Sequence, residues 1–388
     1  MPVYALYAVW FVASGLSEAQ ISALFVIWSV VGLVVEVPSG ALADRFSRRG
    51  AVVAAGLGQA VGYAVWALWP TFAGFALGFA LWAIGGSLDS GAREALLYDA
   101  LAAAGAQARY ARLIGATTAA GLLAEVPAAG LATLLWSVGG FTAVAWASVG
   151  TCLLAAVVAT RLPETRPDPG SGPDGSTDRS TDRSTDRSTD RSTDGRTDDD
   201  EPGYRAALRA GIAEAAARPA VRALLVPVAV LAGVDAVEEY FPLLAADWSV
   251  PTGFVPLAVV ATSVTGAAGA ALAGRVAGWS RWRLAAVVAG AGAALAVAAA
   301  LAVPAGMVLV AAFYGAYRMV LVVLQARLQD RIGGPARATV TSVAGLATEV
   351  VGIGVFAAWA LGGVWPVVVA ALAVAALLPR LLRGDGRG

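Results

Sequence analysis

Long apolar stretches, separated by short segments that contain glycine, proline or arginine, dominate the pattern of this chain. A helix needs about 20 apolar residues to cross the hydrocarbon core of a bilayer, and most of the stretches reach that length. Such a pattern is typical of helices that cross a membrane repeatedly. It predicts an all-α polytopic membrane protein with twelve spans, at residues 2–14, 20–42, 51–69, 71–95, 110–135, 141–160, 221–246, 254–277, 284–303, 305–328, 338–361 and 364–382.

The first of these spans is too short for a complete crossing, because its apolar stretch already ends at Ser14. We therefore expect a truncated first helix, either because the true start lies upstream of Met1, which we favour, or because this copy of the protein is itself truncated. A signal peptide is the alternative interpretation. Against it, the stretch has no positively charged start and no small-residue cleavage site.

Arginines occur in alternate connections between the spans. Positively charged residues are retained on the cytoplasmic side of a membrane. We therefore predict a multi-pass protein of the cytoplasmic membrane, with both termini and the central loop in the cytoplasm. The arginine-bearing segments are residues 45–49, 109–112, 161 onward, 281–283, 331–337 and 383–387.

The composition supports this class and excludes others. Hydrophobic residues make up 58% of the chain and charged residues 14%, against about 25% charged in soluble domains. A formal net charge of zero gives no electrostatic basis for binding nucleic acid. Histidine is absent and Cys152 is the only cysteine, which excludes an internal disulfide and His- or thiolate-based metal sites. We expect no cofactor, no metal and no enzymatic activity, since no nucleophile–base constellation is visible.

A low-complexity segment divides the chain. Residues 163–203 include a repeated Ser-Thr-Asp-Arg motif and have too few apolar side chains to fold. We expect a solvated linker, with partner docking as the alternative, and a short surface helix at residues 204–217. The predicted domains are a six-helix bundle at 1–160, a cytoplasmic loop with an amphipathic helix at 161–219, and a second six-helix bundle at 220–388.

Sequence motifs recur at matching places in the two halves. Residues 120–126 (AGLLAEV) in the fifth span correspond to residues 344–350 (AGLATEV) in the eleventh. Residues 42–45 (LADR) after the second span correspond to residues 272–275 (LAGR) after the eighth. Two parallel repeats of this kind predict a cavity between the halves, near the middle of the membrane.

Residues 40–50 (GALADRFSRRG) resemble the signature Gly-x-x-x-Asp-Arg-x-Gly-Arg-Arg of the major facilitator superfamily, which lies between its second and third helices. Ser47 stands where glycine is usual. Residues 36–40 and 89–99 resemble a bacterial branch of unassigned substrate, whereas drug-exporter motifs match poorly. The resemblance implies a carrier whose two bundles rock around a central site. It also implies a gating role for Gly40, Asp44, Arg45, Arg48 and Arg49, with cytoplasmic retention as the alternative for the last two.

Several ionisable residues lie inside the predicted spans, where they are costly and usually face a cavity or a partner. Asp235, Glu238 and Glu239 are spaced to form one stripe of a helical seventh span. Carboxylates this close cannot all be ionised at low cost, which suits proton coupling. The alternative is that Glu238 or Glu239 is merely solvated at the extracellular mouth.

The other candidates are single charges. Arg318, near the middle of the tenth span, requires a carboxylate, and Glu349, Glu239 and Asp89 are the candidates for it. It could bind an anionic substrate or act as a structural lock. We expect the symmetry mates Glu125 and Glu349 to face the cavity, and Asp89 to form an internal ion pair with Arg93. Glu36 should brace the signature loop. Glu94 and Asp99 should be solvated.

Together these features predict a secondary active transporter that moves a small molecule by alternating access. We expect a monomer in the lipid bilayer, coupled to protons through Glu239, with export favoured over uptake. Its cavity would be lined by Asp89, Glu125, Arg318 and Glu349. The alternatives are a uniporter or uptake permease for a neutral solute, and a non-transporting membrane scaffold or sensor.

Overall fold

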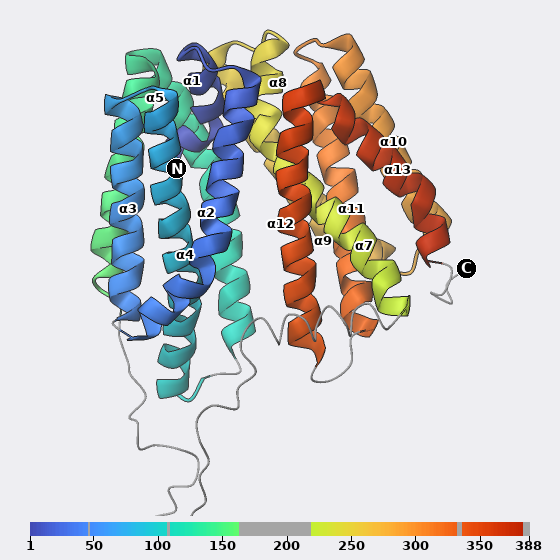
Figure 1. Cartoon of the computed structure of the whole chain (residues 1–388), viewed down its shortest axis with the longest axis horizontal. Helices are drawn as coiled ribbons and strands as arrows, with labels where there is room; N and C mark the ends of the chain where they lie inside the picture. The colour runs from blue at the N-terminus through green and yellow to red at the C-terminus, as the bar shows by residue number, and fades with distance from the viewer. Residues whose placement is uncertain (46, 107–108, 163–218, 332–335, 383–388) are drawn as a thin grey trace, which may run out of the picture.

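The computed structural model describes residues 1–45, 47–106, 109–162, 219–331 and 336–382. The repeat loop and the short helix expected at 204–217 lie outside these residues. Every regular element in the described residues is a helix (Figure 1). The elements are η1 (Pro2–Ala5), α1 (Tyr7–Ala13), α2 (Glu18–Arg45), α3 (Arg48–Leu68), α4 (Phe72–Ala103), α5 (Tyr110–Ala159), α7 (Pro219–Val234), η3 (Asp235–Tyr240), α8 (Phe241–Asp247), η4 (Thr252–Phe254), α9 (Val255–Val276), α10 (Arg281–Leu301), α11 (Gly306–Arg331), α12 (Ala336–Gly362) and α13 (Trp365–Leu381).

These elements account for the twelve predicted spans. The fifth and sixth spans both lie in α5, where the chain reverses at Gly139 and Gly140. Gly140 has φ +59°, a left-handed conformation that glycine adopts without steric cost. The first span consists of η1 and α1, and the seventh consists of α7, η3 and α8. The predicted all-α architecture with twelve helical spans is thus confirmed.

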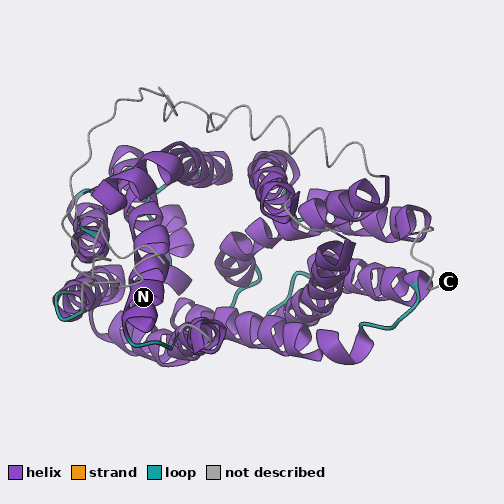
Figure 2. Cartoon of the chain, turned by 90° about the horizontal axis from the view of Figure 1, so that it is seen from below, coloured by secondary structure: helices purple, strands orange, loops and turns teal. Residues whose placement is uncertain are grey.

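Helices pack in equivalent pairs on the two sides of the molecule (Figures 1 and 2). In the first half α2 packs on α4, α4 on α3, and α3 on α5; Gly56 of α3 lies against Ala156 in the sixth span. In the second half α9 packs on α11, α11 on α10, and α10 on α13. These are the same ordinal pairs of spans, as the sequence repeat predicted.

Contacts between the two halves also involve equivalent spans. The second span, α2, packs on the eleventh, α12, and the fifth span, in α5, packs on the eighth, α9. If the two halves are exchanged, each of these two interhelical contacts takes the place of the other. A two-fold axis through the middle of the molecule relates contacts in this way.

The two ends of the bundle differ. One end, at the top of Figure 1, carries α1 and α8; we call it the closed end. The opposite end carries the connection before Arg48 and the one before Arg281, and we call it the arginine end. At the closed end, aromatic rings fill the space between helices: Tyr7 lies 5.9 Å from Trp66 and 5.7 Å from Phe79, centroid to centroid.

Candidate functional site

The seventh span is interrupted where its carboxylates lie. Pro242 has no N–H, so the carbonyl oxygen of Glu238 instead accepts a hydrogen bond from the N–H of Phe241, three residues on. Residues Asp235–Tyr240 consequently form a 3₁₀ helix rather than the continuous α-helix we expected. With about three residues per turn, Asp235 and Glu238 lie one above the other on one face, and Glu239 points to another.

Asp235 and Glu238 face α11 of the same half. The hydroxyl of Tyr314 donates to Asp235 Oδ1 at 3.0 Å and also to Glu238, and the hydroxyl of Tyr317 donates to Asp235. Arg318 Nη1 donates to Asp235 Oδ2 at 2.6 Å, forming an ion pair. The partners predicted for Arg318 are therefore wrong: α7 packs against α11, which brings Asp235 to the guanidinium.

Glu239 faces the first half of the molecule. The hydroxyl of Tyr7 donates to Glu239, and that of Tyr4 donates at 3.4 Å to Glu239 and at 3.3 Å to Glu238. Both tyrosines belong to the first span and the carboxylates to the seventh. These hydrogen bonds therefore join the two halves near the closed end.

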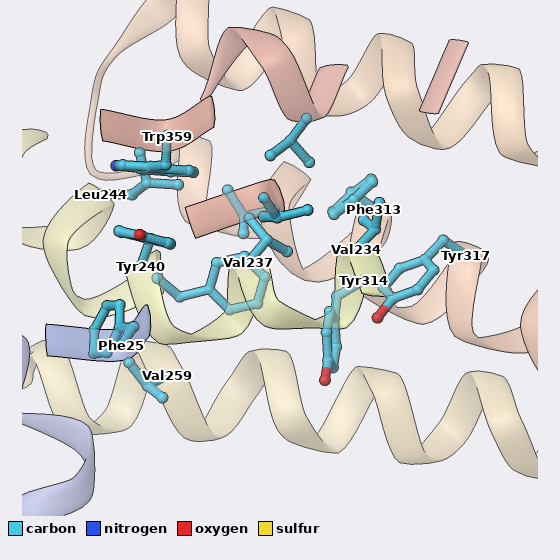
Figure 3. Packing of buried hydrophobic residues seen from close by; sticks show 14 of the residues in the cluster. Phe25, Val234, Val237, Tyr240, Leu244, Val259, Phe313, Tyr314, Tyr317 and Trp359 are labelled. Carbon is cyan, nitrogen blue, oxygen red and sulfur yellow. The ribbon is translucent and has the colours of Figure 1, made fainter. Parts of the chain in front are cut away.

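Tyr240 completes this junction. Its hydroxyl lies 2.7 Å from Ser22 Oγ of α2. Its ring stacks on Trp359 of α12 at 4.1 Å between centroids and contacts Phe25 of α2 edge-on at 5.3 Å, as Figure 3 shows. Apolar and hydrogen-bonded contacts thus close this end of the bundle.

Two adjoining cavities lie between the halves on the arginine side of this junction. The larger has a volume of about 650 Å³ and the smaller about 260 Å³. They share Trp28, Ser29 and Glu349, and we call them together the central cavity. The larger part follows one face of α2 from Trp28 to Glu36, toward the arginine end. The smaller part reaches Asp235, Glu238 and Glu239.

Not all predicted residues line this cavity. Asp235, Glu239 and Glu349 do, and so does Glu36, which we expected at the signature loop instead. Arg318 reaches the site through its ion pair with Asp235.

The other predicted residues lie elsewhere. Asp89 is not among the residues that line the central cavity; it forms the expected ion pair with Arg93, at 3.2 Å. Glu125 does not line it either. The two symmetry mates Glu125 and Glu349 thus occupy different surroundings.

The signature residues occupy the arginine end. Gly40, Asp44 and Arg45 lie in the last turns of α2, and their side chains are outside the described part of the structure. Arg48 forms an ion pair with Asp99 of α4. The expected solvation of Asp99 is therefore wrong. Arg49 Nη1 donates to the carbonyl oxygen of Leu162 at 3.4 Å.

Four aromatic residues of the site were not predicted from the sequence: Tyr4, Tyr7, Trp28 and Trp82. The two tryptophans could have been predicted as site residues, because Trp28 and Trp82 lie inside their spans, whereas tryptophan is usually enriched at the membrane interfaces. Their rings are 5.9 Å apart, and both line the larger cavity. Within the described ranges, no cluster of His, Cys, Asp or Glu is arranged to hold a metal ion.

Comparison with known proteins agrees with this architecture. Residues 3–357 match the model of the Major Facilitator Superfamily. A mutant of the nucleoside transporter NupG superimposes with a TM-score of 0.71 at 12% identity, over 98% of this chain and 96% of that one. A D-xylose–proton symporter gives 0.68 at 13% identity, over 100% and 93%.

A bacterial homologue of the human lysosomal transporter Spinster, in an inward-facing and unoccupied conformation, gives a TM-score of 0.67 at 16% identity, over 99% of this chain and 95% of that one. No curated protein matches the chain. These structural likenesses, at low identity, show the fold, whereas the family model covers most of the sequence. The chain therefore belongs to the major facilitator superfamily and is a secondary transporter of that type.

Proposed function

We propose that this protein exports a small solute across the cytoplasmic membrane and couples this movement to protons through Glu239. One observation carries the proposal: Glu239 lines the central cavity and also accepts a hydrogen bond from Tyr7 of the opposite half. A proton taken up or released at this carboxyl group therefore acts directly on the junction that holds the closed end together.

The coupling follows from the cost of enclosing a charge. The groups that face Glu239 are the hydroxyls of Tyr4 and Tyr7, the neighbouring Glu238, and Glu349 across the smaller cavity. Glu239 forms no ion pair with any of the described residues. An ionised carboxylate without a cation costs several kcal/mol to enclose, so protonation stabilises the closed junction. Loss of the proton favours separation of the halves, which admits water to the carboxylate.

The direction of opening supports export. The central cavity extends along α2 toward the arginine end, which the distribution of arginines predicts to be cytoplasmic. In this conformation the site is positioned to take solute from the cytoplasmic side. A similarly folded carrier has been described as inward-facing, and another as a proton symporter. Entry of a proton from outside would then return the emptied carrier to the conformation described here.

The coupling can be tested without knowing the solute. Spin labels at Ala19→Cys in α2 and Ser249→Cys after α8, in a Cys152→Ser background, report the width of the closed end, because both positions are exposed there. Acidification should increase the population with the short distance. Glu239→Gln, which stays neutral, should hold the short distance at every pH. Glu94→Gln, at an exposed residue of α4 that does not line the cavity, should respond like the wild type. A normal pH response in Glu239→Gln would reject Glu239 as the coupling group.

A further inference from the structure

We infer that the solute is an organic cation with a compact apolar or aromatic body, bound between Glu349 of α12 and the tryptophan pair Trp28–Trp82. This inference rests on the proposed transport function and names the class of solute that the central cavity accepts. Three independent properties of the cavity wall lead to it: its charge, its aromatic surface and its small number of neutral polar groups.

The charge of the wall is negative. Glu36 and Glu349 line the larger part, and Asp235, Glu238 and Glu239 the smaller part. Among the described residues that line either part there is no arginine. The guanidinium of Arg318, which reaches the smaller part through Asp235, is held by that carboxylate at 2.6 Å. An anion entering this space would meet like charges in a confined volume, whereas a cation would be attracted.

Glu349 is the best placed of these carboxylates to contact a solute. It borders both parts of the cavity and is exposed to them. Asp235 already has Arg318, and Glu238 and Glu239 accept tyrosine hydroxyls. For Glu349, by contrast, no ion pair or hydrogen bond is formed within the described part of the chain, so its carboxylate is available to a ligand.

The aromatic surface faces Glu349 from the other half. Trp28 of α2 and Trp82 of α4 lie 5.9 Å apart with their planes inclined by 36°, and both border the larger part of the cavity together with Glu349. Tryptophan is the side chain whose ring face attracts a cation most strongly. A cation placed between the indoles and the carboxylate would touch both halves, because α2 packs on α12 at this level.

The neutral polar groups are too few for a solute rich in hydroxyl or amide groups. The larger cavity offers Ser29, Ser87 and Ser90, and the Ser87 hydroxyl already bonds to the carbonyl oxygen of Gly32. No asparagine or glutamine lines the described wall of either part. A sugar or a nucleoside would regain only part of its hydrogen bonds to water, those that the carboxylates, the indole N–H groups and a few serines offer. The volume of about 650 Å³ is in the range of sites for drug-sized molecules.

Three probes that share a benzyl group separate charge from shape. Benzyltrimethylammonium is cationic, neopentylbenzene is its neutral isostere, and phenylmethanesulfonate is anionic. Binding to the purified full-length protein in lipid nanodiscs can be measured by calorimetry and by quenching of tryptophan fluorescence, with protein-free nanodiscs subtracted. We expect saturable binding of the cation, at least about tenfold tighter than that of either other probe.

Variants of one position test the contact. Glu349→Gln should weaken binding of the cation by about tenfold or more, and Glu349→Asp, which keeps the charge, should recover most of it. Glu94→Gln is the matched control and should bind like the wild type. The melting temperature of each variant shows whether it is folded.

Equal affinity for the three probes, absence of saturable cation binding, or unchanged cation binding in a folded Glu349→Gln protein would each overturn the inference. These outcomes are distinct from a failure of the proposed coupling. Binding is measured at one pH and does not require Glu239 to exchange a proton, whereas the label distances across the closed end do not require a solute.

Discussion

Arg318 and Asp235 form an ion pair, at 2.6 Å between Nη1 and Oδ2, that joins α11 to the 3₁₀ segment of the seventh span. The pair engages the guanidinium of Arg318, and no arginine is among the described residues that line the cavity beside these carboxylates. As a result Glu238 and Glu239 are held by tyrosine hydroxyls and not by a cation. We therefore propose a structural role for Arg318, which would leave Glu239 able to exchange a proton.

The ion pair should stabilise the protein measurably. Because both side chains are partly enclosed, Arg318→Gln or Asp235→Asn should each lower the free energy of unfolding by about 1.5–3 kcal/mol. The double variant should lose less than the sum of the two, because the second change removes a group that is already without its partner. Arg93→Gln breaks the more exposed pair with Asp89 and serves as the control, with a cost of under about 1 kcal/mol. Thermal melting in one detergent compares the four variants with the wild type; additive losses would contradict a direct interaction.

Two buried tyrosines should respond in opposite ways to loss of their hydroxyl. The Tyr7 hydroxyl donates to Glu239, so Tyr7→Phe should cost about 1–2 kcal/mol of stability and weaken the closed junction. The Tyr63 hydroxyl is buried and has no hydrogen-bond partner within the described residues. Tyr63→Phe should therefore leave the melting temperature unchanged or raise it. Equal losses in the two variants would show that the Tyr7 hydrogen bond contributes nothing specific.

The crossing of α9 and α11 depends on two glycines. A Cβ atom on Gly269 would overlap the carbonyl oxygen of Gly315, whereas a Cβ atom on Gly290 of α10 would meet open space. Gly269→Ala should force the helices apart and lower stability by about 1–3 kcal/mol. Gly290→Ala should have no such cost. A stable Gly269→Ala protein with unchanged transport would mean that the two helices do not approach this closely.

Binding and coupling should be separable in a flux assay. In proteoliposomes with a pH gradient, radiolabelled benzyltrimethylammonium should accumulate against its own gradient when protons flow in the opposite direction. Glu239→Gln should still bind the cation but lose gradient-driven accumulation, whereas Glu94→Gln should retain both. Flux of the cation down its own gradient in the wild type, with no accumulation and no response to the pH gradient, would instead indicate a uniporter.

The sequence predicted the number and order of the spans because each requires a long apolar stretch, which is visible without knowing the neighbours. It also predicted the repeat and the ion pair of Asp89 with Arg93, since these depend on spacing along one helix. The domain boundaries, the orientation in the membrane and the roles of the site residues remain predictions that follow from these patterns.

What the sequence did not predict depends on how the helices are rotated and tilted. A helix that is apolar on all sides gives no stripe to show which face is inside, so the partner of Arg318 and the cavity position of Glu36 were not foreseen. The 3₁₀ segment before Pro242 redirected Glu239 toward the first span, where Tyr4 and Tyr7 meet it. These tyrosines carry no charge and occur in a short span, and nothing in their spacing marks them as partners of a carboxylate.

Alternating access requires that the two halves move as units around the central cavity, so that closure of one end accompanies opening of the other. Distances between pairs of spin labels at the two ends test this directly. One pair is Ala19→Cys with Ser249→Cys at the closed end, and the other is Ala104→Cys with Asp330→Cys at the arginine end. All four positions are exposed. On a change from acidic to alkaline buffer, the closed-end distance should lengthen as the arginine-end distance shortens, by matching fractions of the population. Distances that lengthen together at both ends, or that do not change at either, would contradict alternating access in this protein.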